Sequence, residues 1–350
     1  MYGLYQIVYF TIIDILNTLK SPFFILVFLI IYFQYYQIRK LEKRYLGFNR
    51  SPLLKAAIST FYGILGGIIT TVAFIYLEVV AIPMDYLYIL FVVIIMSFFD
   101  QRFMCFSYGG AIVSLSNLIL GFPEIKIPSV MSVVAVLHIV ESLLILVDGW
   151  RHKIPMYFVR EHMTVGGFQM SRFWPVPFVI FVGDGLIYPV TLMAVLSYGD
   201  YSISTYPRKK ALETSLLLFI YSIVLLYISK TVENLLLAPI FALVGHEFII
   251  YFNKKKEEIR EPIFIPLNKG VRVIEVIPGT IAHKVGLKIG DIVLKINGVE
   301  INSERDLRDF MKVDFNRLKI EYFNLKSGLM EKNYHGIKKS LGLIVVPRDF

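Results

Sequence analysis

The chain has 350 residues, of which 56% are hydrophobic, 15% aromatic and only 18% charged, with a formal net charge of +9. A composition this apolar is typical of a protein whose solvent is the bilayer. The positive charge would also suit nucleic-acid binding, but the basic residues flank apolar segments, where they orient helices and meet anionic headgroups. We therefore expect membrane lipids as partners and no nucleic acid. The single cysteine, Cys105, excludes an intramolecular disulfide, and we expect it to pack rather than to join a metal cluster.

Residues 1–20 differ from the apolar segments that follow them. Asp14 and Asn17 interrupt this stretch, and no basic n-region or small-residue cleavage site is present, so it is not a secretory signal. Its apolar residues recur near one face, which predicts either an interfacial helix or a first membrane span.

Residues 21–251 are predicted to form a helical transmembrane domain of six to eight spans. Apolar segments recur at 22–36, 61–81, 84–99, 105–120, 128–147, 174–196, 211–228 and 235–251. Most of them approach the roughly 20 residues that a spanning helix needs. The 105–120 segment is short and rich in Gly and Ser, and Pro177, Asp184 and Pro189 interrupt the 174–196 segment. We expect one of these two segments to be re-entrant or to pass twice.

Basic residues concentrate in four stretches, at 39–55, 151–172, 208–210 and 254–260. Because basic loops stay on the cytoplasmic side, the first and the last stretch place the C-terminal region in the cytoplasm. All four stretches cannot share that side if every apolar segment crosses once.

Among the ionisable residues within or beside the apolar segments, two His–Glu pairs have a spacing that suggests a function or a structural role. His138 and Glu141 are three residues apart and share a helix face, which suits a proton relay, an ion site or a pair that locks two helices together. His246 and Glu247 begin a zinc-protease motif, but the position that needs a second His is Ile250. We therefore predict no metal site, and expect His138, Glu141, His246 and Glu247 to form a buried polar cluster that fixes helix register.

The last part of the chain has the pattern of a small domain after a basic linker, residues 252–262. Val271, Val273 and Val276 lie at the spacing of a buried strand face, and Asn297-Gly298 favours a tight hairpin. The stretches 270–282, 285–287 and 290–298 resemble the core of bacterial PDZ domains. Ser303 is placed to cap a following helix. The resemblance assigns residues 263–350 to one PDZ domain of α+β fold.

The final segment, 340–346, resembles the carboxylate-binding loop and the adjoining edge strand of PDZ domains. Because this strand comes last, the domain is expected to be circularly permuted, as in the bacterial type. Backbone N–H groups would hold a ligand carboxylate while the ligand adds a strand to the sheet. The alternative is that the strand only completes the sheet. The expected groove residues are Lys338, Lys339, Leu341, Gly342, Leu343, Ile344 and Val345 on the loop and strand, and Glu304, Leu307 and Arg308 on the helix.

The membrane part also carries short motifs of a known family. They are the segments 138–145, 148–149, 166–169, 173–177, 238–239 and 245–247. These motifs resemble the MinJ-type proteins of Firmicutes, which are polytopic α-helical membrane proteins with a C-terminal cytoplasmic PDZ domain. The resemblance implies an adaptor of cell division, enriched at septum and poles of the bacterial membrane. It would link DivIVA to the MinC–MinD inhibitor and contact divisome proteins.

Two other functions remain open at this level. The membrane part could transport or sense a small solute under control of its PDZ domain, or the chain could be a degenerate relative of an intramembrane protease. The sequence has neither a Gly-x-Ser-x-Gly elbow nor a Walker-type phosphate loop. We therefore expect no enzymatic activity and no cofactor.

Overall fold

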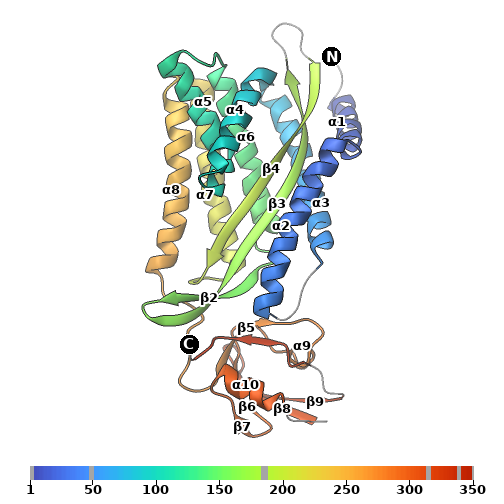
Figure 1. Ribbon diagram of the computed structural model, residues 1–350, viewed down its shortest axis with the longest axis vertical. Helices are drawn as coiled ribbons and strands as arrows, with labels where there is room; N and C mark the ends of the chain where they lie inside the picture. The colour runs from blue at the N-terminus through green and yellow to red at the C-terminus, as the bar shows by residue number, and fades with distance from the viewer. Residues whose placement is uncertain (1–3, 47–50, 183–187, 313–316, 337–339, 349–350) are drawn as a thin grey trace.

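The computed structural model describes residues 4–46, 51–182, 188–312, 317–336 and 340–348. Its N-terminal part consists of helices that surround a long β-hairpin, and its C-terminal part is a smaller β-rich domain beyond one end of the helices (Figure 1). The chain therefore combines the predicted apolar helices with a separate C-terminal domain.

Eight α-helices belong to the described part of the N-terminal region. They are α1 (Leu4–Leu19), α2 (Pro22–Leu46), α3 (Pro52–Tyr76), α4 (Pro83–Ser97), α5 (Phe106–Leu120), α6 (Ile127–Leu144), α7 (Pro207–Thr231) and α8 (Leu237–Ile259). Four segments are long and apolar enough to cross a membrane, namely Pro22–Lys43, Pro52–Tyr76, Ile127–Gly149 and Pro207–Thr231. The predicted number of six to eight also counted shorter segments, among them α4, α5 and 174–196.

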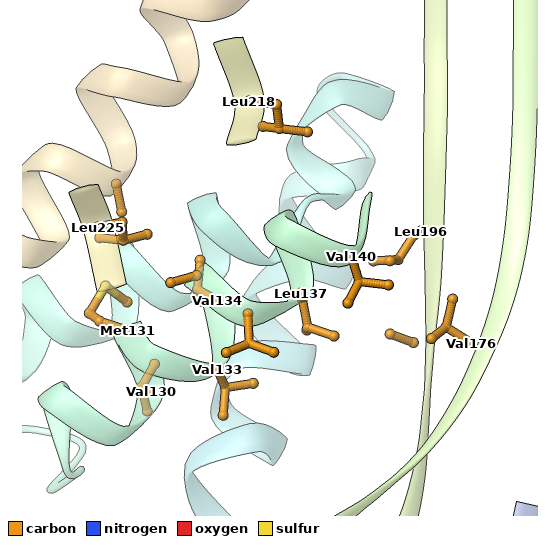
Figure 2. Close-up of a cluster of buried hydrophobic side chains, with 14 of the residues drawn as sticks. Val130, Met131, Val133, Val134, Leu137, Val140, Val176, Leu196, Leu218 and Leu225 are labelled. Carbon is orange, nitrogen blue, oxygen red and sulfur yellow. The ribbon is translucent and has the colours of Figure 1, made fainter. Parts of the chain in front are cut away.

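Helix α6 is the central helix of this region. Its apolar window is 72% buried, as expected for a helix that is hydrophobic on every side. One face packs against α7 and another against the hairpin, so α6 ties the helices to the strands (Figure 2). The contact is built from Val130, Met131, Val133, Val134, Leu137 and Val140 on α6, Leu218 and Leu225 on α7, and Val176 and Leu196 on the hairpin.

The described residues of the 174–196 segment, 174–182 and 188–196, form strands, contrary to the prediction of a helical domain. It lies within the antiparallel pair β3 (Met163–Val182) and β4 (Tyr188–Ser202), and β2 (Ile154–Arg160) pairs with the first part of β3. Pro175 and Pro177 explain the difference, because each would remove a hydrogen bond and clash inside a helix, whereas a strand edge accepts proline. The sequence leaves open whether this segment or 105–120 is re-entrant or passes twice, and here the two described strands run in opposite directions. Asp184 lies outside the described residues.

Helices α2 and α3 satisfy the edge of β3 that faces away from β4. The Phe173 N–H donates to Tyr35 Oη at 3.2 Å, and the Val179 N–H donates to Thr71 Oγ1 at 2.9 Å. Further along, the short strand β1 (Val80–Ala81) pairs with the end of β3. These contacts matter because an unpaired N–H group is costly in an apolar environment.

Between these contacts, two prolines and two glycines let α3 lie directly on β3. Pro175 and Pro177 have no N–H to satisfy, and their carbonyl oxygens lie against Gly63 and Gly67 of α3. A Cβ atom would be 2.0 Å from the Pro175 oxygen at Gly63 and 1.8 Å from the Pro177 oxygen at Gly67. The seam between α3 and β3 therefore requires glycine at both positions.

The hairpin resolves the conflict among the four basic stretches. Because β3 and β4 run out and back, the ends of α2, α6 and α8 and the starts of α3 and α7 lie at the end nearest the C-terminal domain (Figure 1). Three ion pairs at this end are buried, and each charge has a partner because an unpaired charge in a surrounding of low polarity is costly. The pairs are Lys55–Glu42 at 2.6 Å, Lys210–Glu257 at 3.3 Å and Arg172–Asp148, whose Nε–Oδ2 distance is 2.8 Å.

The C-terminal domain has a sheet of order β10-β5-β6-β8-β9, with β7 beside β6. Its elements are β5 (Val271–Val276), α9 (Ile281–Val285), β6 (Ile292–Ile296), β7 (Val299–Glu300), α10 (Glu304–Phe310), β8 (Arg317–Asn324), β9 (Gly328–His335) and β10 (Leu343–Val345). Asn297 and Gly298 have the positive φ angles predicted for a tight turn, and Ser303 caps α10 in a capping box with Asp306. The last strand, β10, pairs antiparallel with β5, which confirms the permuted order.

The seam between α3 and β3 gives a first prediction. Gly67→Val is expected to destabilise the protein by about 1–3 kcal/mol, because the new side chain overlaps the Pro177 carbonyl. The measurement is the thermal unfolding midpoint of the detergent-purified chain. Gly199→Ala in β4 is the matched control, since nothing lies within 4 Å of its added Cβ. Equal unfolding midpoints for the two variants would contradict the requirement for glycine at the contact between α3 and β3.

Candidate functional site: a peptide groove beside a docked hairpin

The loop before β10 is held by the N-terminal side of α9. The backbone carbonyls of residues 340–342 all accept hydrogen bonds from this region, which turns them inward. The donors are the N–H groups of Ile281, Ala282 and Ile277, at 3.2, 3.0 and 2.8 Å. This arrangement fixes the loop without using the N–H groups of its own residues.

Those N–H groups are available to a ligand. The amides of Leu341 and Gly342 donate no hydrogen bond to any residue that the structure describes. Gly342 has φ +70°, and a Cβ there would lie 2.2 Å from Thr280 Oγ1, so only glycine fits. Adjacent free N–H groups on such a loop form an anion-binding nest, which can hold a carboxylate.

Strand β10 offers an open edge next to this loop. Gly342 and Val346 hydrogen-bond to the β5 side, through Ile277 and Arg272, so the alternating pattern turns the backbone groups of Leu343 and Val345 to the open side. Among the described strands only β5 pairs with β10. An extended peptide could therefore add to the sheet here.

The structure distributes the other predicted groove residues unevenly. Leu307 is buried and anchors α10 in the domain core, whereas Arg308 is exposed and lies 4.0 Å from Glu304, which is partly buried. Leu341 and Val345 are buried in the core, and Ile344 faces the hairpin instead of the groove. Lys338 and Lys339 lie outside the described residues.

Tyr157 of β2 reaches the open edge of β10, a contact that the sequence did not indicate. Its hydroxyl donates to the Val345 carbonyl at 3.1 Å. Burial raises the pKa of Tyr157 to about 12, with the charge of Glu304 adding to the shift and that of Arg308 opposing it. The phenol is therefore a neutral donor at physiological pH. It closes the end of the groove that lies away from the carboxylate-binding loop.

The hairpin and the C-terminal domain share an apolar contact. The Gly166 N–H donates to the Phe264 carbonyl at 2.8 Å, and Lys153 lies 3.7 Å from Glu275 at the side of the contact. Burial of these side chains holds the domain against β3. The buried members are Phe168, Phe264, Ile274, Ile344 and Val346.

Three of the four residues predicted for the polar cluster in the helical part lie together, and Cys105 joins them; the three are His138, Glu141 and His246. The prediction that Cys105 only packs is wrong, because its Sγ lies 3.1 Å from His138 Nε2 and 3.6 Å from His246 Nε2. The two imidazole rings are 5.5 Å apart, centroid to centroid. Cys105 is separated along the chain by 33 positions from His138 and by 141 positions from His246. No local sequence pattern could therefore have revealed these contacts.

The two predicted glutamates take different positions around this cluster. Glu141 Oε2 lies 3.9 Å from His138 Nε2. Glu247 accepts a hydrogen bond of 2.7 Å from Tyr108 Oη and lies 3.7 Å from Arg102. Glu141 therefore stays with the His pair, and Glu247 belongs to a neighbouring contact.

Comparisons with known proteins agree with this architecture. Residues 272–320, from β5 into β8, match the family profile described as PDZ domain. The chain is also 26% identical over 111 residues to the cell division topological determinant MinJ of Bacillus subtilis (strain 168). That similarity spans 31% of this chain and 28% of the relative.

Fold and groove thus define a membrane protein whose apolar helices are followed by a C-terminal PDZ domain. Within that class, the partial similarity to MinJ of Bacillus subtilis supports an assignment of this chain to the MinJ-type proteins.

The Tyr157 contact gives a second prediction. Tyr157→Phe keeps the ring but removes a hydrogen bond worth about 0.5–1.5 kcal/mol, so amide exchange in β10 is expected to speed up by roughly 2–10-fold. Hydrogen–deuterium exchange with mass spectrometry of the purified full chain measures this rate. Tyr227→Phe, at an exposed position on α7, is the control and is expected to leave β10 unchanged. If amide exchange in β10 were unchanged in both variants, Tyr157 would not contribute to the edge of the groove.

Proposed function

We propose that the chain is a membrane-anchored, non-enzymatic adaptor that recruits proteins through its PDZ groove. The observation that carries the proposal is the loop at residues 340–342, whose carbonyls are bound by the α9 region while the amides of Leu341 and Gly342 donate to none of the described residues. Beside it, β10 has an open edge. A C-terminal peptide needs these two features together, namely a nest for its carboxylate and an edge for its backbone.

The membrane part gives the groove its location. The described residues of the four basic stretches lie toward the end next to the PDZ domain (Figure 1), which supports a cytoplasmic PDZ domain on a multi-pass anchor. An anchor confines the groove near other membrane-bound proteins and raises its effective concentration, so modest affinity suffices for recruitment.

The similarity to a cell division topological determinant supports a role in division. We further propose specific partners for this role: the chain bridges DivIVA to MinC–MinD and contacts divisome proteins. An N-terminal fluorescent fusion is then expected to concentrate at septum and poles during one division cycle. An even membrane signal that persists through constriction would contradict the division role and leave the PDZ adaptor alone.

The groove itself is tested with peptides and matched variants. Peptides with free C-terminal carboxylates, selected from a random library on the purified full chain, are expected to bind about 10–100-fold more weakly once amidated, because a charge-assisted hydrogen bond is lost. Leu343→Pro removes an N–H from the open edge of β10 and is expected to abolish binding.

Leu329→Pro, which changes a residue of β9 at the far edge of the sheet, is the matched control for this substitution, with thermal unfolding measured for both variants. Amidated peptides that bind as well as free acids would contradict a carboxylate-binding groove.

A further inference from the structure

Three elements that are distant in sequence converge on one point inside the helical part. Cys105 immediately precedes α5 and accepts a hydrogen bond from the Ser107 N–H, so its sulfur is held at the turn between two 15-residue helices, α4 and α5. His138 lies within α6 and His246 within α8. At about 1.5 Å per residue, α4 and α5 are each near 22 Å long, too short to cross a bilayer core. Cys105, at the end of the segment that connects them, contacts α6 through His138 and α8 through His246.

The side-chain orientation at His138 is already that of a metal ligand. Its Nδ1 lies 2.7 Å from the Val134 carbonyl, which can only accept, so Nδ1 carries the proton. The lone pair is therefore on Nε2, the atom that faces Cys105 Sγ. Metal-binding histidines characteristically donate their other ring N–H to a carbonyl or carboxylate in this way, which fixes tautomer and orientation.

His246 supplies an independent observation. Its Nε2 lies 3.6 Å from Cys105 Sγ, while its buried Nδ1 has no hydrogen-bond partner among the described residues. A ring nitrogen that is buried without a partner calls for an explanation, since most buried polar atoms are paired. Because no hydrogen bond from Nδ1 to a described residue holds this ring, a metal bond at Nε2, the atom that faces Cys105 Sγ, would be the contact that fixes its orientation.

From this geometry we infer that Cys105, His138 and His246 form a site for a zinc-class transition metal ion. The three donor atoms all lie within 4.8 Å of one another. Zinc bonds of about 2.3 Å to sulfur and 2.0–2.1 Å to nitrogen place S and N of a tetrahedral site about 3.6 Å apart. The Cys105–His246 distance equals that value, and the Cys105–His138 distance of 3.1 Å needs an expansion of about 0.5 Å.

Charge supports the same class of ion. Glu141, 3.9 Å from His138 Nε2, is placed to be the fourth ligand or to hold a bound water. A divalent cation with one thiolate and one carboxylate is neutral, which lowers the cost of its burial among apolar helices. Sulfur and imidazole donors in a compact set favour Zn²⁺ over Mg²⁺ or Ca²⁺, which prefer oxygen. The ion would tie the turn before α5 to α6 and α8.

The test uses the full chain in detergent with a tag that contains no histidine. After chelator treatment and dialysis, Co²⁺ is added as a spectroscopic probe, and Zn²⁺ is then used to displace it. Because Cys105 is the only cysteine, a thiolate-to-cobalt charge-transfer band can come from this residue alone. We expect about one Co²⁺ per chain with such a band, and loss of the band on Zn²⁺ addition.

Ligand variants and a surface control complete the experiment. Cys105→Ser is expected to abolish the band, and His246→Ala to weaken Co²⁺ binding roughly 100-fold or more. His283→Ala, exposed on α9, is expected to bind like the parent chain. Size-exclusion profiles verify that each variant is folded. If the folded parent chain shows no band and binds Co²⁺ no better than Cys105→Ser, the three side chains form only a hydrogen-bonded group and the inference is wrong.

Discussion

The contact between α3 and β3 is the constraint on which the rest of the structure depends. A strand surrounded by apolar helices must leave none of its backbone groups without a partner. Here the two prolines remove two N–H groups, Tyr35 and Thr71 accept from two more, and Gly63 and Gly67 let the helix approach the remaining carbonyls. With this edge covered, the hairpin can lie among helices that would otherwise have to pack on one another.

The same strand connects the membrane part to the PDZ domain. The segment of β3 near Val176 packs against α6, whereas its beginning, at Gly166 and Phe168, contacts the PDZ domain through Phe264 and Ile274. Its neighbour β2 contributes Tyr157 to the groove edge. A displacement of the hairpin would therefore act on the groove directly, and a ligand strand that extends past Val345 must compete with the Tyr157 hydroxyl.

Local signals in the sequence were sufficient for the PDZ domain and insufficient for the hairpin. Asn297-Gly298 and the Ser303 cap follow from turn chemistry and capping, and the final strand follows from the resemblance to PDZ domains; the structure has all three as predicted. The 174–196 segment is mostly apolar on both sides of Asp184, and short apolar runs do not distinguish a buried strand from a helix. Proline interrupts a helix, but the alternate spacing of Pro175 and Pro177 also fits a strand edge. The meeting of Cys105 with two histidines depends on tertiary packing alone.

The most direct test of this account is a disulfide between facing residues of the hairpin. In a Cys105→Ser background, Val179→Cys combined with Thr191→Cys is expected to form a crosslink under mild oxidation, because these residues are opposite each other in β3 and β4. Val179→Cys with Ser197→Cys, six residues further along β4 and about 20 Å away, is expected to form none. In a helix, residues 179 and 191 would be about 18 Å apart. Failure of the first pair to crosslink in membranes would contradict a hairpin within the helical part. It would also contradict the contact between this hairpin and the PDZ domain.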